Sequence, residues 1–378
     1  MLTARAAWGQ SGDINGDGCV DLQDVAVVQR GMTGPQCTPG DAFMEMVLVP
    51  GGGAGPEYDF LIGKYEVTNE QFAAFLNDAQ ADGGQTLRGS AIRIGTNKDV
   101  RTITGVLIAQ PYYLAYNPEA PVGQRFRAEL GYEKKPVFDV AWIASAKFCN
   151  WLTVHSGLSE DDACYVEVDD VVGWRPRVIS REEWRDRDLN DFERHRLVTE
   201  CRGYRLPMDA VGMEGAITVD GNPFDEWYKA AAYDPDAPNY ERPSTGEVTV
   251  KPNALARHWR FGFGRDELTA FNAHCGLGRV GLDGGFSPVG WFDGSNWMYE
   301  PIGTTEMSVS HFGLFDVSGN APEWVQDRMS YSPCFATRGG AYWSGYIGGT
   351  SGCEATARLM VCNDVWLGWT GLRVVRVP

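Results

Sequence analysis

The segment FGLFDVSGNAPEWVQD, residues 312–327, decides the fold of this chain. Its first half is rich in glycine, aspartate and asparagine between apolar residues, which predicts a tight turn, and its second half predicts a short buried strand. Two carboxylates flank the turn, and two backbone carbonyls between them can point the same way. Hard oxygen ligands of this kind suit Ca²⁺. The segment therefore predicts a calcium site with four ligands: Asp316, Gly319, Ala321 and Glu323.

Two shorter phrases follow this segment, RGGAYWSG at 338–345 and GLRVVRV at 371–377. Together the three phrases resemble the signature of the formylglycine-generating enzyme (sulfatase-modifying factor) family. Further blocks stand upstream in the family's order, including MVLVPGG at 46–52, IGKYEVTN at 62–69, PV at 136–137, FCNWL at 148–152, YRLP at 204–207 and EWYKAA at 226–231. Over residues 43–378 the resemblance implies an α+β, irregular and loop-rich fold, a variant of the C-type lectin arrangement.

The resemblance also implies where redox chemistry would lie. Family members place a serine directly after R-G-G and then two cysteines that hold copper(I). Here Ala341 takes the serine position, Ser344 the first cysteine position, and Gly349 or Thr350 the second. Because hydroxyl groups do not replace a bis-thiolate copper site, we expect no copper and assign no catalytic residue. The alternative is a metal-dependent oxidase of the same family whose ligands come from non-matching positions.

Without the copper site, the resemblance implies a binding scaffold. Relatives in the lectin-like superfamily display variable ligand surfaces built from the residues that follow R-G-G. Aromatic side chains with small polar neighbours suit a sugar ring or a protein loop, so we expect a glycan or protein partner. The competing interpretation places the tryptophans in the core. The expected face comprises Tyr342, Trp343, Ser344, Tyr346, Val365, Trp366 and Trp369.

A second calcium motif, DINGDGCVDLQD, occupies residues 13–24. It has the spacing of an EF-hand-type loop, with a glycine at the sharp turn and a carboxylate at the twelfth place. The ligands would be Asp13, Asn15, Asp17, Cys19 through its carbonyl, Asp21 and Asp24. With the helix that follows, the motif resembles half of a dockerin, which implies a cohesin-type partner through residues 13–34. A calcium-stabilised cap is the alternative. We therefore expect a module over 1–40 and a large domain over 43–378.

The family resemblance implies one more calcium site in the large domain. Relatives build it from one asparagine and one aspartate side chain with neighbouring carbonyls. The corresponding residues here are Asn272, Ala273 and Asp283, although the spacing around Asp283 differs. A purely structural turn is the competing interpretation.

Composition constrains the setting in which the protein works. The net charge of −17 argues against nucleic acid, which binds to basic surfaces, and no apolar run reaches membrane-spanning length. Nine cysteines without a C-x-x-C pair favour disulfides in an oxidising compartment, so we expect a secreted, extracellular or periplasmic protein. No signal peptide is visible at the start. The pairs we expect are Cys19–Cys37, Cys164–Cys201 and Cys353–Cys362.

Overall fold

The computed structural model describes thirteen stretches of the chain: 43–53, 55–81, 113–117, 119–138, 140–168, 173–209, 224–237, 258–277, 285–329, 334–343, 352–355, 357–362 and 370–378. Several predicted features lie outside these residues. They are the calcium loop at 13–24 with its helix, the Cys19–Cys37 pair, and the site residues Asp283, Ser344, Tyr346, Val365, Trp366 and Trp369.

The architecture is mixed α+β, with short elements joined by long irregular connections, as the sequence predicted. The helices are α2 (Asn69–Ala81), α3 (Trp142–His155), the 3-10 turn η1 (Glu160–Asp162), α4 (Arg181–Asp186), α5 (Asp191–Glu200) and α6 (Glu226–Ala231). The strands are β1 (Met46–Val49), β2 (Phe60–Gly63), β3 (Leu114–Tyr116), β4 (Phe126–Ala128), β5 (Tyr165–Val166), β6 (Arg175–Pro176), β7 (Trp297–Tyr299), β8 (Ile302–Thr304), β9 (Glu323–Met329), β10 (Cys334–Arg338), β11 (Arg358–Cys362), β12 (Gly371–Leu372) and β13 (Val375–Arg376).

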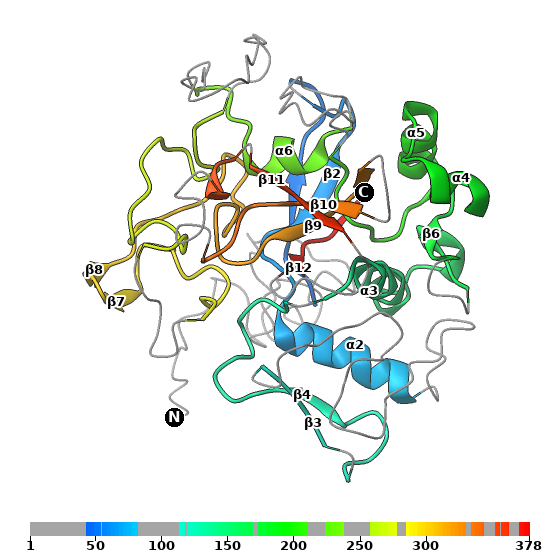
Figure 1. The fold of residues 1–378 in the computed structure, drawn as a ribbon, viewed down its shortest axis with the longest axis horizontal. Helices are drawn as coiled ribbons and strands as arrows, with labels where there is room; N and C mark the ends of the chain where they lie inside the picture. Colours follow the sequence, from blue (N-terminus) through cyan, green and yellow to red (C-terminus); the bar gives the residue numbers. More distant parts are fainter. Residues whose placement is uncertain are drawn as a thin grey trace, which may run out of the picture.

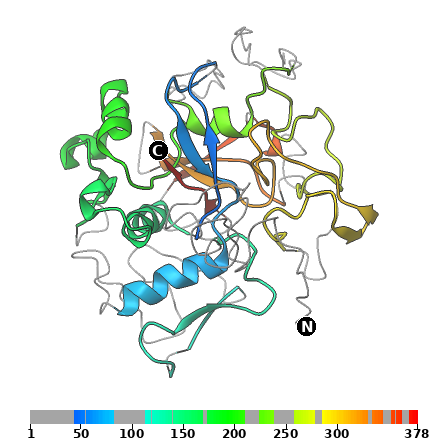
Figure 2. The same cartoon turned by 180° about the vertical axis from the view of Figure 1, so that it is seen from behind.

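Two small sheets form the centre of the fold (Figures 1 and 2). One has the strand order β1-β2-β13 and the other β11-β10-β9-β12. The C-terminal segment belongs to both, because β12 runs parallel to β9 and β13 runs antiparallel to β2. Arg373 lies between these two strands and is therefore held where the sheets meet.

Helices α2 and α3 supply the largest hydrophobic core. Phe72, Phe75 and Leu76 recur at helical spacing after Thr68, a pattern that predicts a capped helix over 69–79, and the structure confirms both features. The Thr68 hydroxyl accepts a hydrogen bond from the Gln71 amide at 3.3 Å, and the Gln71 side chain accepts one from the Thr68 amide at 2.8 Å. Phe72 stacks on Phe148 of α3 with ring centroids 5.6 Å apart. In Figure 1, α2 lies between α3 and the β3–β4 hairpin.

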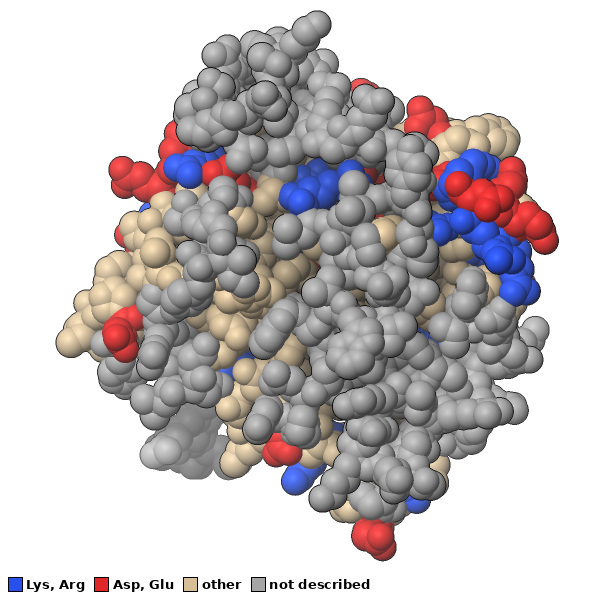
Figure 3. All heavy atoms as spheres, viewed as in Figure 1, with Lys and Arg blue, Asp and Glu red and all other residues tan. Residues whose placement is uncertain are grey.

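The charged run within 159–203, which by its composition predicts a solvated helix, forms two short helices, α4 and α5. Both helices begin with a side-chain cap, from Ser180 in α4 and Asn190 in α5. Trp184, on α4, is buried. Figure 3 shows acidic and basic side chains side by side over these two helices, without a separate basic surface on that part of this face. No helix among the described residues is long and apolar enough to cross a membrane.

The cysteines correct two of the expected pairs. Cys353 is bonded to Cys275, not to Cys362. The reason lies in the strand register, because Cys362 stands opposite Cys334 in the β10–β11 ladder, and Cys334 is itself disulfide-bonded. Cys164 and Cys201 are buried free thiols rather than the expected disulfide, and the Cys164 thiol donates to the Gly203 carbonyl at 3.4 Å.

Candidate functional site

The 312–327 segment forms the tight corner that the sequence predicted. Asp316 and Asn320 adopt left-handed backbone conformations, with φ of 59° and 57°. Gly319, with φ of 102°, brings the backbone so near that a Cβ atom there would lie 2.4 Å from the His274 carbonyl oxygen. Strand β9 begins directly afterwards at Glu323. The turn and the buried strand are therefore confirmed.

Glu323 is part of a fully buried ion pair. One carboxylate oxygen accepts hydrogen bonds from Arg373 Nη2 at 2.6 Å and Nε at 2.9 Å. The other accepts a hydrogen bond from Trp227 Nε1 at 2.8 Å. Both oxygens thus have protein partners in a site without solvent, where such a pair is favourable only when its hydrogen bonds are complete. This geometry gives Glu323 a structural role, and its assignment as a calcium ligand stays a prediction.

Arg373 also connects three separate parts of the chain. Its Nη1 donates to the carbonyls of Gly63 and Lys64 at 2.9 and 2.8 Å, and its Nη2 donates to Phe315 at 2.8 Å. The guanidinium therefore joins the end of β2, the corner and β9. Its role in this arrangement is to hold the corner against both sheets.

Sequence reasoning missed Glu66, whose side chain is hydrogen-bonded to the corner. Its carboxylate is buried and accepts hydrogen bonds from Asn320 Nδ2 at 2.7 Å and from the Ala321 amide at 2.9 Å. The available signal was a lone acidic residue in the IGKYEVTN block at 62–69. Only the folded chain shows which loop that residue meets.

The acidic groups at the corner outnumber the cation that faces them. Burial, with the negative charges of Asp316 and Glu323, raises the pKa of Glu66 well above its usual range. Burial likewise raises the pKa of Asp316 to about 6, although the Gly290 amide donates to that carboxylate at 2.6 Å. Three carboxylates share Arg373, so the excess negative charge requires protons or a bound cation.

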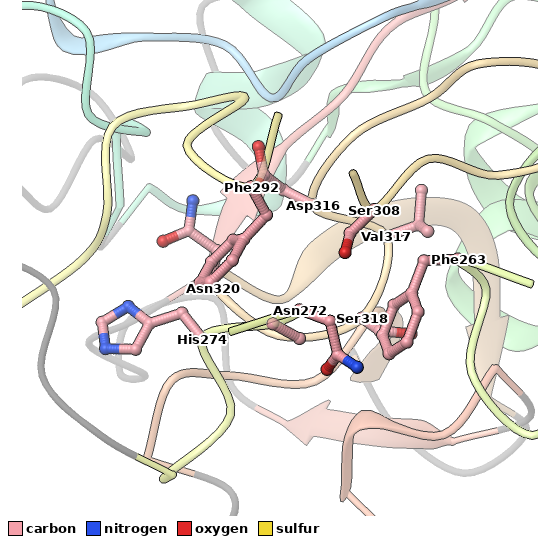
Figure 4. A pocket seen from close by; sticks show the side chains of 10 residues that line it. Phe263, Asn272, His274, Phe292, Ser308, Asp316, Val317, Ser318 and Asn320 are labelled. Carbon is pink, nitrogen blue, oxygen red and sulfur yellow. The ribbon is translucent and has the colours of Figure 1, made fainter. Parts of the chain in front are cut away.

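A small cavity brings the two predicted calcium sites of the large domain next to each other. It measures about 10 Å³, roughly enough for one water molecule, and both Asn272 and Asp316 line it. The two polar groups do not point at a common centre in Figure 4. Asn272 Oδ1 instead accepts a hydrogen bond from the Thr269 amide at 2.9 Å.

The fit of these residues to a calcium ion is therefore incomplete. No group of three or more His, Cys, Asp or Glu side chains among the described residues is placed to hold a metal. Ala273 packs in a hydrophobic cluster, which leaves only its backbone for such a role. Calcium binding in the large domain therefore stays a prediction for Asp316, Gly319, Ala321, Glu323, Asn272 and Ala273.

The segment after R-G-G begins with an alanine that is completely buried, Ala341. Tyr342 and Trp343 follow and are half-buried. Their rings lie 4.8 and 6.4 Å from that of Phe286, and the ring of His274 lies 5.3 Å from that of Tyr342. These two residues combine both sequence interpretations, since each packs on the core with one side and reaches solvent with the other.

Free thiols lie elsewhere in the described part of the chain. Cys149, Cys164 and Cys201 are all buried in the cluster around α3, whereas Tyr342 and Trp343 pack in a different one. Burial raises the pKa of the Cys149 thiol far above its usual range, so thiolate formation there is suppressed.

Residues 42–378 match the family model of the sulfatase-modifying factor enzyme 1-like domain, FGE-sulfatase. The chain belongs to this family. No curated protein matches it. Similar solved structures include one titled "Crystal Structure of CarF", at 18% identity and a TM-score of 0.47, covering 89% of this chain and 98% of that one.

Two further solved structures resemble this chain at similar levels. Treponema denticola variable protein 1 is 17% identical, with a TM-score of 0.40, and the match covers 88% of this chain and 95% of that one. PvdO from Pseudomonas aeruginosa is 16% identical, with a TM-score of 0.37, and the match covers 88% and 94%.

Proposed function

We propose that this chain is a binding member of its family that has lost copper redox chemistry. Its ligand would be a glycan or protein outside the cytoplasm, held on the face that begins at Tyr342. The observation that carries the proposal is Ala341. It puts a buried methyl group at the position directly after R-G-G, where copper-binding family members have a serine. A methyl group neither coordinates a metal nor exchanges a proton.

The cysteines support the same proposal. Cys275 and Cys353 are joined in a disulfide, and Cys353 lies directly beside Gly340, since a Cβ atom on that glycine would lie 2.8 Å from the Cys353 Cα. Cys353, the cysteine beside the R-G-G segment, is thus unavailable as a thiolate ligand. Disulfides also favour the extracellular or periplasmic location predicted from the sequence.

The aromatic surface supplies the binding half of the proposal. Tyr342 and Trp343 meet edge to face, with ring centroids 5.1 Å apart, over the buried rings of Phe138 and Phe286. Rings supported from beneath lose little conformational entropy when a ligand packs on them.

Metal analysis with an oxygen-consumption assay on the purified full chain tests the redox half. We expect no stoichiometric copper or iron and no oxygen consumption with thiol substrates. Stoichiometric redox metal with turnover would replace the proposal by the metal-dependent oxidase.

A glycan and peptide array tests whether the face that begins at Tyr342 binds a ligand. It compares Trp343→Ala with Phe192→Ala, a control at an exposed aromatic residue on α5. Ligand capture unchanged by Trp343→Ala would reject this face.

A further inference from the structure

The β7–β8 hairpin presents an apolar face to solvent. The antiparallel register pairs Trp297 with Thr304, Met298 with Gly303, and Tyr299 with Ile302. Directly paired residues share a face of the hairpin, and residues two apart along one strand also point to the same face. Trp297, Thr304 and Ile302 therefore lie on one face. Trp297 is 53% exposed and Ile302 is 75% exposed. Figures 1 and 2 show the hairpin projecting at the periphery of the molecule.

The opposite face of the hairpin is fixed to the protein. Met298 is buried in a small cluster with Phe292. Gly303 lies so near Phe271 that a Cβ atom there would come within 2.5 Å of the ring. The hairpin cannot turn its outer face inward without losing these contacts. Trp297 and Ile302 are therefore held toward solvent by the packing behind them.

Among the residues that the structure describes, the surroundings of this face are polar and carry little positive charge. The turn before β7 is closed by Asp293, whose carboxylate accepts hydrogen bonds from the Ser295 amide and hydroxyl, both at 2.8 Å, and from Asn296 Nδ2 at 3.0 Å. Glu300 is exposed at the tip. Nearby Arg265 forms an ion pair with Glu306, which neutralises its charge.

Size and charge limit what this face can bind. The apolar part of this face comprises Trp297 and Ile302. Together they offer on the order of 300 Å², given that a large aromatic side chain buries up to about 250 Å². A stable dimer buries about 800 Å² on each partner, so the patch is too small for one by itself. The exposed Glu300 and the net charge of −17 oppose an anionic membrane or polysaccharide.

We propose that the β7–β8 face is a saccharide-binding platform, on which the Trp297 ring stacks against the apolar face of a neutral pyranose. The Thr304 hydroxyl, directly across from Trp297 in the register, is placed to hydrogen-bond a sugar hydroxyl. Ile302 extends the apolar surface along the strand toward a second sugar unit. This platform is separate from the face that begins at Tyr342, and it does not depend on a ligand there.

Calorimetric titration of the purified full chain with neutral hexasaccharides tests this platform. The probes are cellohexaose, maltohexaose, xylohexaose and mannohexaose. We expect at least one to bind, Trp297→Ala to weaken that binding by about tenfold or more, and Ile302→Ala to weaken it less. Phe192→Ala and Leu130→Ala, at exposed positions elsewhere, are the matched controls and should leave affinity unchanged. Both hairpin residues are exposed, so the variants should keep the wild-type thermal midpoint.

Three results would overturn the platform. They are failure of all four sugars to bind, binding that Trp297→Ala leaves intact, and concentration-dependent self-association or sedimentation with phosphatidylcholine vesicles that Trp297→Ala abolishes. The Trp343→Ala variant separates this inference from the proposed function. Sugar binding lost in Trp343→Ala but not in Trp297→Ala rejects the platform and supports the Tyr342 face, and the reverse pattern does the opposite.

Discussion

Substitution of Glu323 by glutamine distinguishes a structural ion pair from a calcium ligand. The glutamine has nearly the same volume and still offers an acceptor, but it removes the charge of the carboxylate hydrogen-bonded to Arg373 and leaves only Glu66 and Asp316 to oppose the guanidinium. Both side chains are 0% exposed, so water cannot compensate. Removing one partner of a buried pair costs about 3–5 kcal/mol of unfolding free energy. We expect Glu323→Gln near the lower end, because the Gly63, Lys64 and Phe315 carbonyls still hold Arg373.

Urea unfolding, followed by tryptophan fluorescence, measures this cost in calcium and in EGTA. If the carboxylate serves Arg373 and Trp227, the loss of stability is the same in both buffers. The variant Arg373→Met supplies the second arm of a double-mutant cycle. We expect the double variant to lose less than the sum of the single losses, with a coupling of about 2 kcal/mol or more.

Two outcomes would refute the structural interpretation of Glu323. A destabilisation seen only in calcium, together with loss of the stabilisation that calcium gives the wild-type protein, would make Glu323 a metal ligand. Costs that add without coupling would mean that Glu323 and Arg373 do not act as a pair.

Three further predictions rest on other buried groups. Burial beside Asp327 raises the pKa of Asp188 to about 7, so the folded state binds a proton that the unfolded state has released above about pH 4. Stability from this group therefore falls as pH rises from about 4 to 7, and Asp188→Asn should flatten that part of the urea-midpoint profile between pH 5 and 8. Gly319→Ala, at φ of 102° and against a carbonyl, should lower the unfolding free energy by about 2 kcal/mol or more, and an unchanged thermal midpoint would contradict the corner geometry. Replacing both Cys275 and Cys353 by serine opens a link across 78 residues and should cost about 2–4 kcal/mol in urea unfolding, whereas equal stability with and without reductant in the wild type would show that this bond is not formed.

The structure describes much of the candidate site, and sequence reasoning reached only part of it. The Gly-Asn turn at 319–320, the start of β9 and the aromatic pair after R-G-G were all predicted. The pairing of Cys353 was wrong, since two cysteines near in sequence were preferred to Cys275, which is far away. The roles of Glu66 and Arg373 at the corner were missed altogether.

The sequence by itself determined the features that depend on neighbouring residues. Glycine and asparagine specify the left-handed corner, and apolar spacing with the Thr68 cap specifies α2, because turn chemistry and helical periodicity act over a few residues. The tertiary structure alone decided the partners of the buried charges. Glu66 meets Asn320 across 254 positions, and Glu323 meets Arg373 across 50. A carboxylate has the same chemistry wherever it stands, so only the fold decides whether it faces a guanidinium, an amide or a cation.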